Sequence, residues 1–206
     1  MFGGPHAYTS LSLFWVGLLV AAYLVGVHGL MLAKPALCKG WLTKLPRHHT
    51  AGVYTLGIGM LWFWLLVAPD KMGGPLSILS SLSMDIGEFN KMKPILRILV
   101  PVIFFGMVTC AREFLFVRGL GVVTLMAASP ILEAAQFKDP TSRLILVVFA
   151  YVLLTKGMFW VGMPFVFRDA VTWATASDSR WKLLVWGGLA FGVLMFVCAL
   201  LFWRGY

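Results

Sequence analysis

The chain has 206 residues, of which 60% are hydrophobic and only 12% are charged, and its mean hydropathy is +0.88. A typical soluble domain is roughly 25% charged, so this composition excludes an intrinsically disordered chain and argues against a water-soluble globule. The three cysteines are too few for a disulfide scaffold. The composition therefore indicates an integral membrane protein.

Long apolar segments recur along the chain, each close to the roughly 20 residues that a helix needs to cross a bilayer. They lack the alternation of barrel strands, and in lipid a continuous apolar segment satisfies its backbone only as a helix. We therefore predict an all-α fold, with residues 1–206 forming a single domain that contains six transmembrane helices. The predicted spans are residues 11–33, 51–68, 94–112, 119–137, 144–167 and 183–203.

One further segment, between the second and third spans, has the pattern of an amphipathic helix. Serines and acidic residues separate its apolar residues, which recur at intervals of three and four and so share one helix face. We predict that residues 76–90 form a helix along the membrane surface. The apolar residues of this pattern are Leu76, Leu79, Leu82, Ile86 and Phe89.

The net charge of +9 is a feature that often indicates nucleic-acid binding. Here the basic residues flank the spans instead, where their side chains reach lipid phosphates. We therefore expect the lipid bilayer and other membrane protein subunits as partners, and no nucleic acid.

Basic residues also indicate an orientation. Six spans place both termini on one side, and the connections after the first, third and fifth spans carry more lysine and arginine than the opposite side. Because lysine and arginine favour cytoplasmic loops, we expect both termini on the non-cytoplasmic side. The expected location is a bacterial inner membrane, crossed several times.

Lys156 is the most informative single residue, because it lies inside the fifth predicted span. It follows Arg143 by 13 residues and precedes Arg168 by 12, which places it near the bilayer centre. A lysine there costs about 3 kcal/mol, so such residues are candidates for a substrate or ion site. A structural role, or a contact with a neighbouring subunit or lipid, is the alternative.

Glu133 is the carboxylate that could complete a substrate or ion site with Lys156. If the fourth and fifth spans form a hairpin with its turn near Pro140, the two residues differ in height by roughly 12 Å. A direct ion pair would then require that Pro130 distort the helix.

Prolines lie within three successive spans, at Pro101, Pro130 and Pro164. Each removes an N–H and frees the carbonyl four residues earlier, which for Pro101 is that of Arg97. The resulting kinks suit a cavity or a gate, although they also occur in membrane helices without such a role.

Small residues at intervals of four predict close helix contacts, since packing rather than hydrophobicity holds helices together in lipid. Contacts inside one bundle explain them without dimerisation. The predicted pairs are Ala22 with Gly26, Thr55 with Gly59, and Gly188 with Gly192.

Three histidines are candidate cofactor ligands. His28 lies near the end of the first span, and His48 and His49 stand on the same side, just before the second. Two helices that each offer a histidine at similar depth could hold a b-type haem, and the imidazoles together with Cys38 could hold zinc. The alternative is that these are ordinary histidines at the membrane surface. We therefore predict no cofactor, and haem remains the candidate if one is bound.

The chain contains no hydrolase elbow, phosphate loop, nucleotide-binding glycine pattern or metalloprotease helix, so we do not expect an enzyme. The first hypothesis is a non-catalytic accessory or structural subunit of a larger membrane complex. The second is a small transporter or channel that uses Lys156. The third is a haem- or pigment-binding electron-transfer subunit that uses His28 with His48 or His49.

Overall fold

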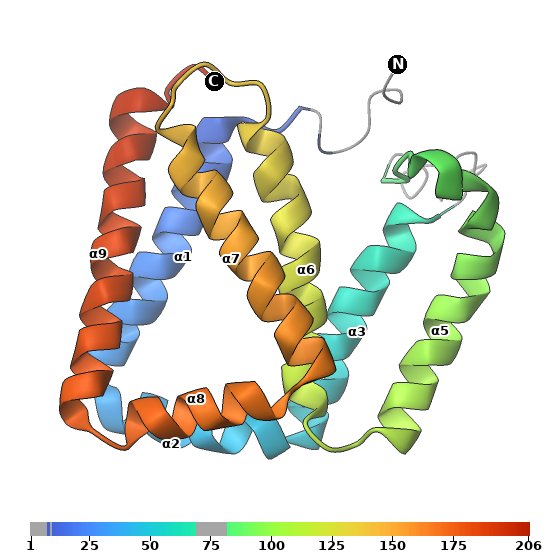
Figure 1. The fold of residues 1–206 in the computed structure, drawn as a ribbon, viewed down its shortest axis with the longest axis horizontal. Coiled ribbons are helices and arrows are strands. Elements are labelled where there is room, and N and C mark those ends of the chain that lie inside the picture. The colour runs from blue at the N-terminus through green and yellow to red at the C-terminus, as the bar shows by residue number, and fades with distance from the viewer. Residues whose placement is uncertain (1–7, 9, 69–81) are drawn as a thin grey trace.

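The computed structural model describes residues 8, 10–68 and 82–206, and within these residues it contains helices and no strand (Figure 1). The predicted all-α fold is therefore confirmed. The helices are α1 (Leu13–Ala33), α2 (Pro35–Lys44), the 3-10 helix η1 (Leu45–Arg47), α3 (His49–Leu66), the 3-10 helix η3 (Gly87–Met92), α5 (Lys93–Cys110), α6 (Leu115–Ala135), α7 (Arg143–Gly162), α8 (Phe165–Thr175) and α9 (Asp178–Phe202).

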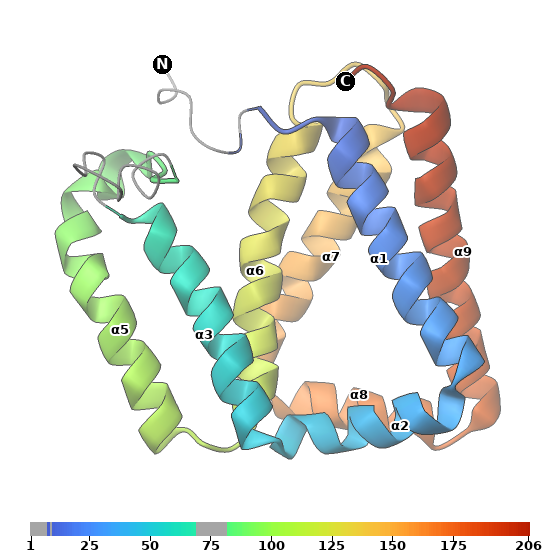
Figure 2. The ribbon, with the colours of Figure 1, turned by 180° about the vertical axis from the view of Figure 1, so that it is seen from behind.

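Five helices of the described chain are long and apolar enough to cross a bilayer, as expected of a multi-pass membrane protein. They are α1, α5 with η3, α6, α7 and α9, and they match five of the six predicted spans. The remaining predicted span corresponds to α3, which has 18 residues and lies between α5 and α6 (Figures 1 and 2). The long helices alternate in direction, so α1 begins and α9 ends at the same end of the molecule.

Two shorter helices, α2 and α8, lie across the long ones at the other end, which we call the α2/α8 end (Figures 1 and 2). The residues of α2 fall in the connection between the first two predicted spans, and the fifth predicted span covers residues 144–167. The structure corrects the span, because α7 ends at Gly162 and Pro164 precedes α8. Proline lacks the N–H that would continue a helix and disfavours helical geometry in the residue before it, here Met163. Pro164 therefore separates two helices instead of kinking one.

The predicted surface helix over residues 76–90 is wrong in its described part. Residues 76–81 lie outside the described residues, residues 83–86 are not helical, and η3 follows. The Asp85 side chain accepts a hydrogen bond from the Gly87 N–H at 2.9 Å, and Gly87 has a left-handed φ of 59°. This local turn competes with a continuous α-helix.

A buried core joins α1, α6, α7 and α9 at the end opposite α2 and α8. Trp203, just after α9, is fully buried at its centre, and its indole Nε1 donates to Ser142 Oγ at 2.9 Å. A Cβ at Gly17 of α1 would overlap the Trp203 ring, so the indole fits only because position 17 has no side chain. The other buried members of this core are Leu13, Ala21, Ile131, Ala135, Leu146, Ala150, Met195, Cys198 and Ala199.

Close glycine contacts hold the helices together in pairs, α1 with α9, α6 with α7, and α3 with α6. A Cβ at Gly121 would lie 2.9 Å from the Gly157 carbonyl oxygen, and a Cβ at Gly192 would lie 2.9 Å from Leu24 Cβ. The predicted contacts at Gly59, Gly188 and Gly192 are confirmed. The close helix contact predicted at the face of Ala22 and Gly26 is wrong, because Ala22 is exposed and a Cβ at Gly26 would meet nothing within 4 Å. The α1/α9 and α6/α7 pairs diverge toward the α2/α8 end (Figure 1).

Gly17→Ala should lower the free energy of unfolding by about 1–3 kcal/mol, the usual cost of inserting a methyl group into a packed core. The matched control is Gly26→Ala on the same helix, where the added methyl group meets nothing. Thermal unfolding in detergent, followed by tryptophan fluorescence, compares the two. Equal melting temperatures would contradict the role assigned to the Gly17–Trp203 contact.

Candidate functional site

A cavity of about 450 Å³ lies between the diverging helix pairs, next to α2 and α8. Its walls come from α1, α2, α7, α8 and α9, and they are mostly apolar. We call it the Lys156 cavity. The residues of its wall that carry polar groups or aromatic rings are His28, Lys156, Trp160, Phe167, Thr175 and Trp181.

Lys156 is the only ammonium group among the described residues that line this cavity. It lies six residues before Gly162, the last residue of α7, and therefore about 9 Å from that helix end. Lys156 therefore lies nearer the α2/α8 end of α7 than the middle of this helix, because α7 ends before the predicted span does. Within the described part of the chain, no carboxylate lines the cavity.

His28 is held between α1 and α9. Its Nδ1 donates to the Leu24 carbonyl oxygen at 2.8 Å, so Nδ1 carries the proton. A Cβ at Gly188 would overlap the imidazole at Nε2, so the ring packs directly on the backbone of α9. Both ring nitrogens therefore face protein, which is unfavourable for an axial metal ligand.

Trp181, at the start of α9, lines the same cavity with a side chain that is almost fully buried. The residue is 6% exposed, and its buried indole N–H has no hydrogen-bond partner among the described residues. A buried donor left without a partner costs about 1–3 kcal/mol. The Lys39 ammonium lies 5.5 Å from the centre of the Trp181 ring and pairs with Asp178 at 2.5 Å, which ties α2 to α9 beside the cavity.

The other two candidate histidines lie in different cavities. His48 caps α3, since the Ala51 N–H donates to its Nδ1 at 3.1 Å, and it lines a cavity of about 400 Å³ with Trp41. His49 lines a third cavity, rich in arginine. The structure therefore does not bring His28 together with His48 or His49. In the described part of the chain, no three His, Cys, Asp or Glu residues group closely enough to hold a metal ion.

Glu133 and Lys156 lie toward opposite ends of the α6/α7 pair. Gly121 contacts Gly157, which fixes the register of the two helices beside Lys156. Glu133 follows Gly121 by 12 residues on α6, or about 18 Å along the axis. The distance between Glu133 and Lys156 along the helix axis is thus larger than the roughly 12 Å that hairpin geometry predicts. The two residues do not form one site.

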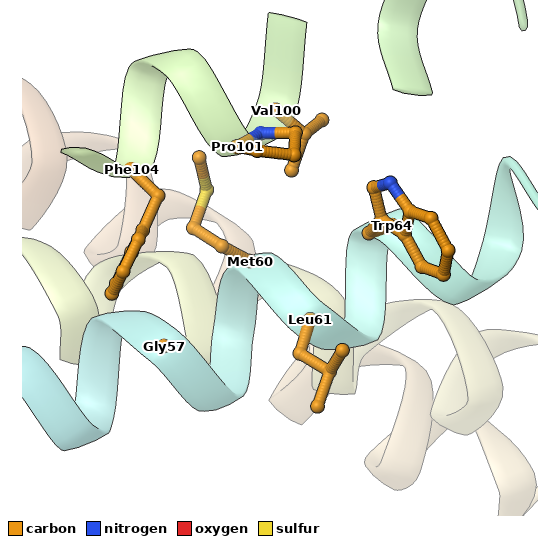
Figure 3. A pocket seen from close by; sticks show the side chains of 7 residues that line it. All are labelled: Gly57, Met60, Leu61, Trp64, Val100, Pro101 and Phe104. Atoms are coloured by element: carbon orange, nitrogen blue, oxygen red, sulfur yellow. The ribbon is translucent and has the colours of Figure 1, made fainter. Parts of the chain in front are cut away.

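A separate apolar cavity of about 360 Å³ lies between α3 and α5 (Figure 3). It contains Pro101, and the carbonyl of Arg97 that this proline frees accepts a hydrogen bond from Trp64 Nε1 at 3.1 Å. The Arg97 side chain in turn donates to the Val67 carbonyl at 2.8 Å. These bonds attach α5 to α3, so Pro101 has a structural role here.

No protein-family model, curated protein or solved structure matches this chain. Lys156 and His28 were both candidates from the sequence, but for different sites, and the structure brings them into one cavity wall. The sequence did not assign Trp181 or the residues of α8 to a site. Pro164 was the available signal, because a helix break there turns the next segment across the end of the bundle.

Gly188→Ala should displace the His28 ring and lower the free energy of unfolding by about 1–3 kcal/mol. Gly187→Ala is the matched control, because a Cβ at that neighbouring position meets nothing within 4 Å. Thermal unfolding measures the difference. Equal melting temperatures of the two variants, or a lower one for Gly187→Ala, would contradict the packing of the His28 ring on Gly188.

Proposed function

We propose that this membrane protein is non-catalytic and binds an anionic amphiphile, such as a fatty acid, in the Lys156 cavity. Lys156 contacts the acidic head group and the apolar wall contacts the chain. The observation that carries the proposal is a single ammonium group in a mostly apolar cavity whose described lining holds no carboxylate.

Electrostatics supports an anionic ligand. Lys156 is exposed on α7, so when this apolar helix crosses a bilayer, lipid rather than water surrounds the side chain. An ammonium group in such surroundings of low dielectric constant is stabilised by a nearby negative charge far more than it would be in water. None of the described carboxylates pairs with Lys156.

The apolar wall supports a ligand with a hydrocarbon chain. Leu184 and Val185 of α9 and Val166 and Val171 of α8 lie on the same cavity as Lys156. Each square ångström of apolar surface that leaves water contributes about 25 cal/mol. An amphiphile would place its head group at Lys156 and its chain along these apolar residues of α8 and α9.

Lys156→Met should weaken the binding of a brominated fatty acid at least tenfold, because a charge-assisted hydrogen bond contributes about 1.5–3 kcal/mol. Binding is measured by bromine quenching of tryptophan fluorescence, since Trp160 and Trp181 line the cavity. The matched brominated alcohol, which has no charge, should bind equally to both proteins. Lys182→Met, a lysine outside the cavity, is the control for charge removal.

Two results would overturn the proposal. One is equal binding of the acid by the wild-type protein and by Lys156→Met. The other is a loss of the same size in Lys182→Met. If fatty-acid binding is absent and the protein copurifies with a stoichiometric partner in mild detergent, an accessory subunit of a membrane complex becomes the better assignment. A coloured preparation would favour the haem-binding alternative.

We further propose that the α2/α8 end faces the cytoplasm of a bacterial inner membrane. The connection that contains α2, the connection between α5 and α6, and α8 all lie at this end (Figure 1), and they carry the larger share of flanking basic residues. The C-terminus then lies on the non-cytoplasmic side, so alkaline phosphatase fused after Tyr206 should be active and green fluorescent protein fused there should not fluoresce. Fluorescence without phosphatase activity would reverse the orientation.

A further inference from the structure

A second cavity at the α2/α8 end is rich in arginine and separate from the Lys156 cavity. Its volume is about 690 Å³, and its residues come from η1, the start of α3, the connection between α5 and α6, and α8. We call it the basic cavity. Its lining residues are Arg47, His49, Arg112, Glu113, Phe114 and Arg168.

Three helix N-termini meet at the basic cavity. His49 is the first residue of α3, Phe114 immediately precedes α6, and Arg168 is in the first turn of α8. Neither α6 nor α8 has a side-chain hydrogen bond that caps its N-terminus. A helix N-terminus carries a partial positive charge, which favours anions and disfavours cations. The arginines therefore add positive charge where the helices already supply it.

The carboxylates near the cavity offset only part of this charge. Arg168 is paired with Asp169, through its Nε at 2.8 Å and its terminal nitrogen at 2.7 Å. Arg112 donates from Nε to the Thr109 carbonyl at 3.2 Å, which is a neutral acceptor. Within the described residues no carboxylate pairs with Arg47 or Arg112, although Glu113 lines the same cavity. An excess of positive charge around one cavity is stabilised by a bound anion.

The backbone at Phe114 is strained in a way that shapes the cavity. Phe114 has a φ of 55°, a left-handed conformation that is uncommon for a bulky residue. Its ring lies 5.8 Å from the Arg168 guanidinium, within the range of a cation–π contact. Strain of this kind is often retained where it positions a functional group, and here it places Phe114 beside Arg168.

We propose that the basic cavity binds a phosphate group through Arg47 and Arg112, with Arg168 and the three helix N-termini completing the positive site. Guanidinium groups match the geometry of phosphate oxygens with paired donors. Arg47 and Arg112 are exposed and lie next to the ends of η1 and α5, where membrane-spanning helices meet lipid head groups. The phosphate belongs to an anionic phospholipid or to a soluble phosphorylated compound, and these two sources are separable by experiment.

The test measures the melting temperature of the detergent-solubilised protein at constant ionic strength, with tryptophan fluorescence as the signal. Phosphatidylglycerol in mixed micelles, phosphatidylcholine in mixed micelles and inorganic phosphate are compared. A ligand that binds the folded state raises the melting temperature with its concentration. We expect a rise with phosphatidylglycerol, and a requirement for at least tenfold more of it in the Arg47→Gln/Arg112→Gln variant.

Arg180→Gln is the matched control. Arg180 lies at the start of α9, also at the α2/α8 end, but its guanidinium stacks on Trp173 at 5.0 Å and does not line the basic cavity. This variant should respond to phosphatidylglycerol as the wild-type protein does.

Without ligand, the melting temperature of Arg47→Gln should be no lower than that of the wild-type protein, because removing one of several neighbouring cations relieves repulsion.

The outcomes separate the two sources and the failure of the proposal. A rise with phosphatidylglycerol alone assigns the site to a lipid, and an equal rise with inorganic phosphate assigns it to a soluble phosphate compound. If neither probe stabilises the wild-type protein, the proposal is overturned, and this comparison needs no variant. It is also overturned if Arg180→Gln loses as much of the response as the double variant.

Discussion

The packing of Trp203 into the space left by Gly17 is the constraint on which the rest of the architecture depends. In lipid, helices gain little from hydrophobicity and associate through close packing. The indole fills the centre of the core that joins α1, α6, α7 and α9, and its hydrogen bond to Ser142 fixes its orientation. Since the two helix pairs are held at this end, their divergence produces space at the other end, where α2 and α8 lie.

That divergent end carries both candidate sites, and they differ in polarity. The Lys156 cavity has one ammonium group in a mostly apolar wall, whereas three arginines line the basic cavity. The apolar wall of the first suits an amphiphile, and the guanidinium groups of the second suit a phosphate group. Helix α8 lines both cavities. It contributes Phe167 to the Lys156 cavity and Arg168 to the basic cavity, so adjacent residues face different chemical environments.

Much of the fold was predictable because it depends on local sequence. Apolar segments of sufficient length define the long helices, and the hairpin register that separates Glu133 from Lys156 follows from the helix rise alone. The missed features are tertiary or depend on one residue. Pro164 could kink a helix or end it, and only the position of α8 distinguishes the two. The shared cavity of His28 and Lys156 requires the pairing of α1 with α9, which no local pattern encodes.

The hydrogen bond from Trp64 to the Arg97 carbonyl has a consequence for biogenesis. An unsatisfied carbonyl inside a bilayer costs several kcal/mol, and Pro101 creates one within α5. Its donor is on α3, an earlier helix of the chain. A nascent chain that inserts from its N-terminus therefore has the indole already in place when α5 enters the lipid, and the order of synthesis matches the order in which the two partners are needed.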